Sequence, residues 1–228
     1  MNLAKGRSTF DAVYSEIRKL SPDHHFEFRD PFWVLITTIL SHRTKDEVTD
    51  AAARNLYKRY GTCESLAGAD YSEVSGLISK VGFYTRKAER VIEVSRILRD
   101  RYNCRVPETI EKLMEFPGVG RKTANVVLAD AMGIPAIAVD THVQRVSRRI
   151  GWSLSDDPEA TEERLRKIVP RDMWLGFNPV LVEFGKHVCK PITPNCTVCG
   201  VRPYCDFYRE ERSKAHAGKR RADSRSRS

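Results

Sequence analysis

Apolar side chains recur at helical spacing along nearly the whole chain. Two stretches show the pattern most clearly: Phe10, Val13, Tyr14, Ile17 and Leu20, and then Ala88, Val91, Ile92, Leu98 and Tyr102. Spacing of three and four residues places such side chains on one face of an α-helix. No segment shows the two-residue alternation that is typical of a half-buried strand. The sequence therefore predicts an all-α fold of about ten helices.

The segment from Phe32 to Leu40 is apolar on all sides. Its β-branched residues would also suit a buried strand, but its neighbours are helical, so we expect a helix surrounded by other helices. Helix starts are predicted at Ser8 and Thr44, because each is followed three residues later by an acidic residue in capping-box spacing. The predicted centre of one helical domain is therefore 32–40.

The 228-residue chain is basic, with a formal net charge of +9 and a pI near 9.3. Residues 214–228 hold six basic residues and one acid, so more than half of the net charge lies there. We expect 211–228 to form a basic flexible tail. A basic surface favours a polyanionic partner such as nucleic acid, although a merely soluble basic surface would have the same composition.

The expected location is intracellular, in the cytoplasm or nucleoid if the source is prokaryotic. The N-terminus lacks the apolar core of a secretion signal, and the longest apolar run is too short to span a bilayer, so no membrane partner is expected. A reducing compartment makes disulfides uncommon. Cys63 and Cys104 are therefore predicted to be reduced cysteines.

A glycine-rich turn at 116–120 joins two helical patterns. Gly118 and Gly120 permit positive φ and a close approach of the backbone, and the following helix presents N–H groups and the positive end of its dipole. A helix-hairpin-helix of this kind binds a DNA phosphate without reading sequence, through the backbone of Gly118, Val119 and Gly120. The alternative is an ordinary tight turn between helices.

Lys122 and Asp140 are the candidate chemical groups. Lys122 lies in the first turn of a predicted helix beside Arg121, where an ammonium ion is disfavoured, and a nucleophilic lysine must be neutral. Taken alone, Lys122 is more readily explained as a solvated lysine that binds phosphate. Asp140 precedes a predicted helix over 141–150, so it is expected to be the N-cap. A carboxylate held there stays ionised and can stabilise an oxocarbenium-like sugar.

Four cysteines near the C-terminus form a C-x6-C-x2-C-x5-C pattern, namely Cys189, Cys196, Cys199 and Cys205. Three prolines interrupt them, so we expect a loop. Four thiols within a short loop of an intracellular protein indicate a metal site, and their chemistry suits either zinc or a [4Fe-4S] cluster. Zinc sites more often pair two short C-x2-4-C knuckles, so the spacing leans toward the cluster.

Taken together, three motifs resemble the endonuclease III family: Leu113–Val127, Ala138–His142 and the cysteine loop, in matching order and spacing over residues 8–210. The resemblance implies a bifunctional DNA glycosylase/AP lyase of base excision repair. Such an enzyme removes oxidised pyrimidines through a lysine Schiff base and cleaves the strand 3′ to the abasic site by β-elimination. Lys122 would be the nucleophile and Asp140 the catalytic carboxylate.

The same resemblance implies two helical domains with the active site in the cleft between them. A six-helix domain with the helix-hairpin-helix would span 22–134, and 1–21 plus 135–210 would form a second domain that carries the cysteine loop. Cys189, Cys196, Cys199 and Cys205 would ligate a [4Fe-4S] cluster. The partner would be double-stranded DNA with damaged pyrimidines or abasic sites, and the chain would act as a monomer.

Two further residues are expected at the DNA. A base inside a duplex must be extruded before it can be excised, and Phe83 aligns with an apolar residue that the family inserts into the gap. The alternative role for the Phe83 side chain is packing in the protein core. Arg43 stands where the family usually has a glutamine that contacts the orphaned base. Arginine binds guanine bidentately, so the expected preference is for lesions opposite guanine.

Two other functions are alternatives to a bifunctional glycosylase/AP lyase. A relative that excises mismatched thymine, uracil or adenine is disfavoured, because base-excision-only relatives generally lack the lysine found at Lys122. The adenine-specific branch also carries a further C-terminal domain, and few residues follow Cys205. From another class, a noncatalytic helix-hairpin-helix DNA-binding module with structural zinc would need neither Lys122 nor Asp140.

Overall fold

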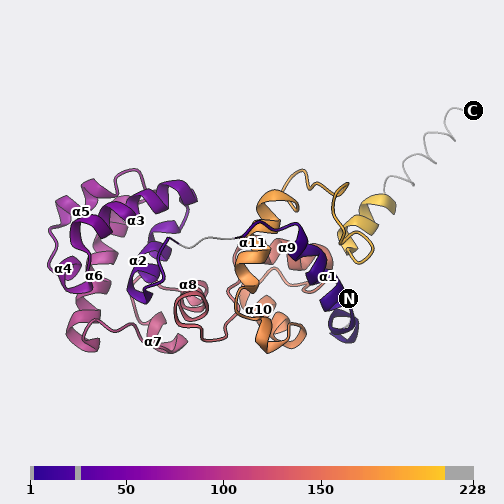
Figure 1. Ribbon diagram of the computed structural model, residues 1–228, viewed down its shortest axis with the longest axis horizontal. Coiled ribbons are helices and arrows are strands. Elements are labelled where there is room, and N and C mark those ends of the chain that lie inside the picture. The colour runs from indigo at the N-terminus through magenta and orange to yellow at the C-terminus, as the bar shows by residue number, and fades with distance from the viewer. Residues whose placement is uncertain (1–2, 24–26, 214–228) are drawn as a thin grey trace, which may run out of the picture. The chain divides into compact units, whose positions relative to one another are not determined.

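The computed structural model describes residues 3–23 and 27–213, and every regular element in those residues is a helix (Figure 1). In chain order the labelled elements are α1 (Leu3–Lys19), α2 (Pro31–Ser41), α3 (Asp46–Tyr60), α4 (Cys63–Ala67), α5 (Tyr71–Leu77), α6 (Tyr84–Tyr102), α7 (Ile110–Met114), α8 (Arg121–Val126), the π-helix η1 (Val127–Ala131), α9 (Thr141–Ile150), α10 (Pro158–Ile168), the 3-10 turn η2 (Arg171–Met173) and α11 (Phe177–His187), and a further helical stretch covers 206–213. The predicted all-α fold is confirmed. Within the described residues, no helix has the length and apolar character needed to cross a membrane.

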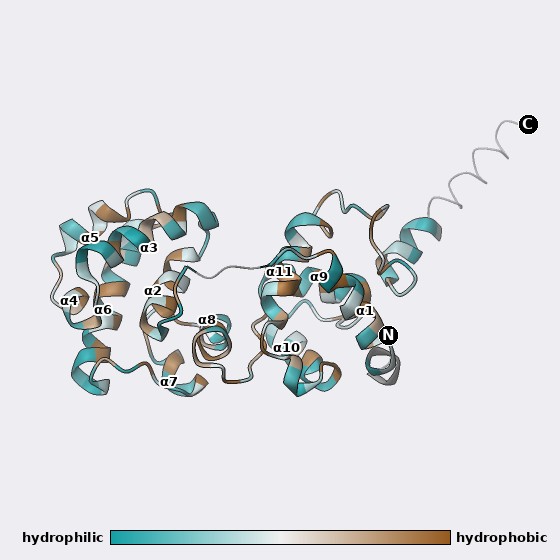
Figure 2. Cartoon of the chain, in the orientation of Figure 1, coloured by the Kyte–Doolittle hydropathy of each residue, from teal (hydrophilic) through white to brown (hydrophobic). Residues whose placement is uncertain are grey.

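The chain divides into two compact units, one made of residues 25–138 and the other of residues 1–24 and 139–228. These boundaries differ by a few residues from those of the predicted domains, which stay a prediction. In Figure 2 most helices carry both hydrophobic and hydrophilic residues, as expected of helices that bury one face. The predicted tail was wrong at its start, because 206–213 are helical. Its remainder, 214–228, lies outside the described residues.

Helix α2 lies at the centre of the unit formed by residues 25–138, as predicted. Asp30 caps its N-terminus by accepting a hydrogen bond from Trp33 N at 3.1 Å, and a proline at the first position suits the start of a helix. Residues 32–40 are buried except for Thr37, which is half-buried. Helices α3, α6 and α8 and the π-helix η1 all pack against α2. This packing holds the ends of α2, α6 and α8, which carry the site residues of this unit.

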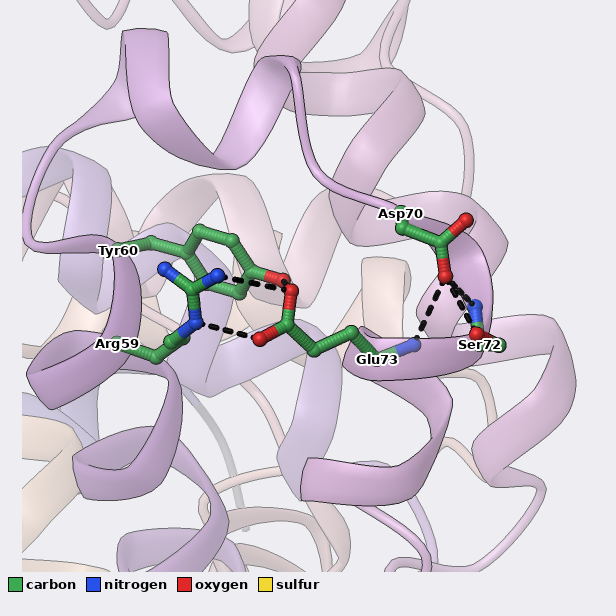
Figure 3. Close-up of polar contacts among 5 residues, drawn as sticks. All are labelled: Arg59, Tyr60, Asp70, Ser72 and Glu73. Carbon is green, nitrogen blue, oxygen red and sulfur yellow. Dashed lines mark hydrogen bonds and ion pairs between the residues drawn. The ribbon is translucent and has the colours of Figure 1, made fainter.

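Polar contacts join the end of α3 to α5 at the surface of the same unit (Figure 3). The Glu73 carboxylate accepts hydrogen bonds from the Arg59 guanidinium and, at 2.9 Å, from the Tyr60 hydroxyl. Burial, followed by the contact with Glu73, raises the pKa of Tyr60 to about 12. Asp70 caps α5 by accepting from the backbone N–H groups of Ser72 and Glu73. These contacts fix α5, from which the chain leads to Phe83.

Residues 3–23 and 139–213 form the described part of the second unit. Helix α1 packs against α10 and α11, and α9 packs against α11. The core between them is aromatic: Phe10 lies 5.4 Å from Trp152 and 6.4 Å from Phe177 between ring centroids. The apolar face predicted for the first helix is buried here. Its predicted start was wrong, however, because α1 begins at Leu3 and Ser8 lies within it.

Cys63 and Cys104 are bonded as a disulfide, so the prediction that both are reduced was wrong. Cys63 opens α4 and Cys104 follows α6, and these two helices pack closely together. The packing brings the two Cα atoms to 5.8 Å, although 41 residues separate them in the sequence. Their spacing matches no disulfide motif, and only the tertiary fold makes them neighbours.

Substituting Cys63→Ser is expected to lower the free energy of unfolding by about 2–4 kcal/mol in the absence of reductant, because the bridge closes a long loop in the unfolded chain. The measurement is urea unfolding of both proteins. In excess dithiothreitol the parent protein should lose most of that advantage, which makes the reduced parent the matched control. Equal stability of parent and variant without reductant would contradict this expectation.

Candidate functional site

The glycine turn lies between α7 and α8, where the sequence predicts a helix-hairpin-helix. Gly118 has a φ of +78°, and a Cβ added there would lie 2.7 Å from Cδ of Arg90. Val119 is buried and donates its N–H to the Phe116 carbonyl at 3.1 Å. Gly120 is the N-cap of α8 and supplies no side-chain cap. The turn thus brings glycine backbone to the start of a helix, as the motif requires.

Lys122 lies in the first turn of α8 and is half-buried. The His42 ring, which follows α2, contacts the hydroxyl of the adjacent Thr123, with 3.1 Å between Nε2 and Oγ1. Burial lowers the pKa of His42, and the positive charge of Lys122 lowers it further, ahead of smaller contributions from Lys87 and Arg90. A neutral imidazole therefore lies in the electrostatic neighbourhood of Lys122.

Asp130 is a second titratable group near Lys122 that we did not single out from the sequence. It lies in the π-helix η1, a type of helix that occurs often at functional sites. Burial raises the pKa of Asp130 to about 7, and the charge of Lys122 opposes that rise. The available signal was that Asp130 is the only charged residue between Lys122 and Asp140.

Replacing Asp130 with Asn is expected to stabilise the protein, and more so at pH 8 than at pH 5.5. The unfolded carboxyl ionises near pH 3.8, whereas the folded carboxyl holds its proton up to pH 7, so the parent loses stability as the pH rises between these values. The substitution should therefore raise the free energy of unfolding by about 2 kcal/mol more at pH 8 than at pH 5.5. Urea unfolding at both pH values measures it, and Glu108→Gln, at an exposed position of the same unit, is the control. A gain independent of pH would contradict the expectation.

Asp140 is the N-cap of α9, as predicted. Its Oδ1 accepts hydrogen bonds from the backbone N–H groups of His142 at 2.9 Å and Val143 at 2.8 Å. Arg145 lies one turn further on, within electrostatic range of the carboxylate, and its guanidinium donates to the carbonyls of Cys189 and Gly185. The two hydrogen bonds at the helix end therefore hold the carboxylate in place. The cap uses Oδ1, and Oδ2 takes no part in it.

Arg43 and Phe83 lie together, although they come from different parts of the sequence. Arg43 lies between α2 and α3, Phe83 immediately precedes α6, and both have a left-handed backbone, with φ of +52° and +58°. The Arg43 guanidinium carbon lies 5.8 Å from the centroid of the Phe83 ring. Phe83 is 59% exposed, so the alternative of core packing was wrong. The capping box predicted at Thr44 was also wrong, because Lys45 is the N-cap of α3.

The four cysteines of the C-terminal loop all line one cavity beneath α9 and α11, together with Arg149, Phe184 and Phe207. Burial first, and then the neighbouring thiols, raise the pKa of Cys205 to about 11. The Arg149 guanidinium lies 3.4 Å from Sγ of Cys189. Among the described residues, no three His, Cys, Asp or Glu side chains converge tightly enough to hold a single metal ion. Four thiolates in one cavity repel one another and need a positive group to offset their charge.

Comparison with known proteins identifies the class to which this fold and turn belong. A family model described as "HhH-GPD superfamily base excision DNA repair protein" matches residues 36–171, which include the turn before α8, Lys122 and Asp140. Endonuclease III of Thermotoga maritima is 49% identical over 194 residues, which cover 85% of this chain and 91% of that protein. The chain therefore belongs to the endonuclease III family.

Solved structures agree with that assignment. One described as "Structure of a Trapped Endonuclease III-DNA Covalent Intermediate: Estranged-Adenine Complex" matches with a TM-score of 0.83 and 35% identity, covering 90% of this chain and 98% of that one. A thermostable thymine-DNA glycosylase matches with a TM-score of 0.82 at 28% identity, covering 91% and 98%. As a member of the endonuclease III family, the chain is a DNA glycosylase with AP lyase activity that acts in base excision repair.

Proposed function

We propose that the chain removes oxidised pyrimidines from duplex DNA and then cleaves the strand, with Lys122 as nucleophile and Asp140 as the assisting carboxylate. The observation that carries the proposal is the match to an endonuclease III structure with a trapped covalent DNA intermediate, over a fold that presents a lysine directly after the glycine turn. It would act as a monomer inside the cell, where its DNA substrate is found.

In the first step the neutral Nζ of Lys122 attacks C1′ of the extruded nucleotide. The N-glycosidic bond breaks, and the base leaves with the bonding electron pair and takes up a proton. Asp140 stabilises the positive charge that develops on the sugar. The C1′–O4′ bond then breaks, O4′ takes its electron pair and a proton, and the opened sugar is left as an iminium ion, or protonated Schiff base, between C1′ and Nζ.

In the second step the iminium ion makes the C2′ proton acidic. A base removes this proton, and the 3′ phosphate leaves with the electron pair of the C3′–O bond, which is a β-elimination. Water then hydrolyses the Schiff base and releases Lys122. The neutral His42 and the carboxyl of Asp130 both lie within electrostatic range of Lys122 and titrate at or below neutral pH.

Binding of the duplex is assigned to two sets of residues. The backbone N–H groups at Gly118 and Gly120 would hold a phosphate at the start of α8, where the helix dipole favours negative charge. The N–H of Val119, which the sequence also suggested, instead closes the turn on the Phe116 carbonyl. Arg43 and Phe83 would enter the space left by the extruded nucleotide. Exposure of both side chains, and their mutual contact, support this assignment.

The cysteine loop is proposed to hold a [4Fe-4S] cluster through Cys189, Cys196, Cys199 and Cys205. The donor set fits, because four thiols line one cavity and cysteine thiolates are the ligands that hold such clusters. When bound, the cluster would supply a rigid cross-link among four points of the loop. Arg149 would offset part of the thiolate charge.

The proposed function is tested with duplexes that contain thymine glycol or an abasic site, with base release and strand cleavage measured separately. We expect both reactions, and a covalent adduct with the strand when borohydride is added. Base release without an adduct would favour a base-excision-only enzyme. Activity on a thymine mismatch and none on thymine glycol would overturn the proposed substrate class.

Substituting Arg43→Gln is expected to abolish a preference for lesions opposite guanine. The Arg43 guanidinium can donate two hydrogen bonds to the O6 and N7 atoms of an orphaned guanine, a pairing that is worth about 1–3 kcal/mol against another base. The measurement is the ratio of kcat/KM opposite guanine to that opposite adenine, in the parent and the variant. Equal rates opposite both bases in the parent would contradict the role of Arg43.

A further inference from the structure

The two residues proposed to enter the duplex, Arg43 and Phe83, occupy strained backbone. Positive φ is uncommon for residues with a side chain, and such conformations persist where surrounding contacts hold them. The loops in question are 42–45, between α2 and α3, and 78–83, between α5 and α6. Something in the structure must therefore hold both loops in place.

Lys87 contacts the end of α2 and the loop 42–45. It is in the first turn of α6 and is 3% exposed. Its Nζ donates to the Leu40 carbonyl at 2.7 Å, to the His42 carbonyl at 2.5 Å and to Oγ1 of Thr44 at 3.0 Å. An ammonium group has three donors, and all three are used here. Burial lowers the pKa of Lys87 to about 8, so the charged form still predominates at neutral pH.

Thr44 connects the two loops. Its Oγ1 accepts a hydrogen bond from Gly82 N at 3.2 Å as well as the one from Lys87. Gly82 itself lies directly against the first loop, because a Cβ added there would be 2.8 Å from the carbonyl oxygen of Arg43. A side chain at position 82 would therefore force the loops apart. These contacts are on either side of Arg43 in one loop and next to Phe83 in the other.

We propose that Lys87 is a positioning residue, which ties loop 42–45 to loop 78–83 through Thr44 so that Arg43 and Phe83 meet the duplex as one paired unit. The inference rests on the proposed function, in which these two side chains enter the space of the extruded nucleotide. Lys87 itself does not touch DNA. Its side chain is buried, and its donors are all engaged within the protein.

If Lys87 positions these two loops, its loss should leave binding of the DNA phosphates intact and impair the opening of the duplex. The glycine turn before α8 would still hold phosphate when the two loops are no longer tied together, because that turn makes none of the three Lys87 contacts. Displacement of the base opposite the lesion would fail, since it needs Arg43 and Phe83 in register. A lysine that served only stability would change both properties together or neither of them.

The test uses the full-length protein and a duplex with 2-aminopurine opposite a tetrahydrofuran abasic analogue, which cannot react. The fluorescence of 2-aminopurine rises when this base is unstacked. For Lys87→Met we expect most of that rise to be lost at saturating protein, while Kd changes by less than roughly threefold because phosphate contacts persist. Lys58→Met, which removes an exposed lysine from α3, is the matched control and should keep the full rise.

Since Lys87→Met could unfold the protein, Thr44→Val provides a second variant that breaks the same link and keeps the buried charge. Thr44→Val should also lose the rise in 2-aminopurine fluorescence. Thr44→Ser keeps a hydroxyl at this position and should show the full rise. A full rise in both Lys87→Met and Thr44→Val would overturn the positioning role. A full rise in Arg43→Ala and Phe83→Ala would instead overturn the proposed function on which the role depends.

Discussion

Substituting Lys122→Gln is expected to abolish the borohydride-trapped adduct and strand cleavage on an abasic-site duplex. The amine at Nζ is the group that forms the Schiff base, and an amide cannot replace it as a nucleophile. Base release from thymine glycol should fall as well, by more than a thousandfold, because the same attack breaks the glycosidic bond and removing the nucleophile of a covalent enzyme can lower kcat by as much as about 10⁶. The measurement is denaturing electrophoresis of the trapped and cleaved strand.

Two controls make this result specific. Affinity for an unreactive abasic analogue should change little, because the glycine turn and not Lys122 is assigned to phosphate. Lys112→Gln removes a lysine from α7 in the same unit and should form a normal adduct. A trapped adduct that persists in Lys122→Gln would place the nucleophile elsewhere in the chain and overturn its assignment.

Asp140→Asn is expected to slow both base release and adduct formation by about 10²–10⁴, because the variant removes the charge that stabilises the developing cation. The fold should be preserved. Asparagine is as good an N-cap as aspartate, and its Oδ1 can still accept from the N–H groups of His142 and Val143. The measurement combines single-turnover rates with the free energy of unfolding.

Comparison with Asp140→Ala separates the two roles of this residue. The alanine variant loses the cap as well as the charge, so it should be less stable than the asparagine variant by about 1 kcal/mol while its rate is similarly low. A normal rate in Asp140→Asn would show that Asp140 is only a helix cap. Low rates in both variants with different stabilities would establish that capping and catalysis use the same carboxylate independently.

The cysteine loop shows how much a local pattern can predict. Cys189, Cys196, Cys199 and Cys205 lie within a stretch of seventeen residues, so their presence around one cavity depends mainly on a short piece of chain that the prolines bend. The sequence indicated a shared site, and in the structure all four line one cavity. Cys63 and Cys104 are the opposite case. Their pairing depends on how α4 packs against α6, which no local pattern reports.

The sequence by itself determined the helical fold, the central helix 32–40, the capping role of Asp140 and the family, because each of these depends on residues close together in the chain. Only the tertiary structure decided which distant residues meet: Lys87 with the two loops, and Arg43 with Phe83. Thr44 illustrates the physical reason. Its spacing to Glu47 favoured a local helix cap. In the structure its Oγ1 instead accepts hydrogen bonds from Lys87 Nζ and Gly82 N. These two groups come near Thr44 only because α6 packs against α2.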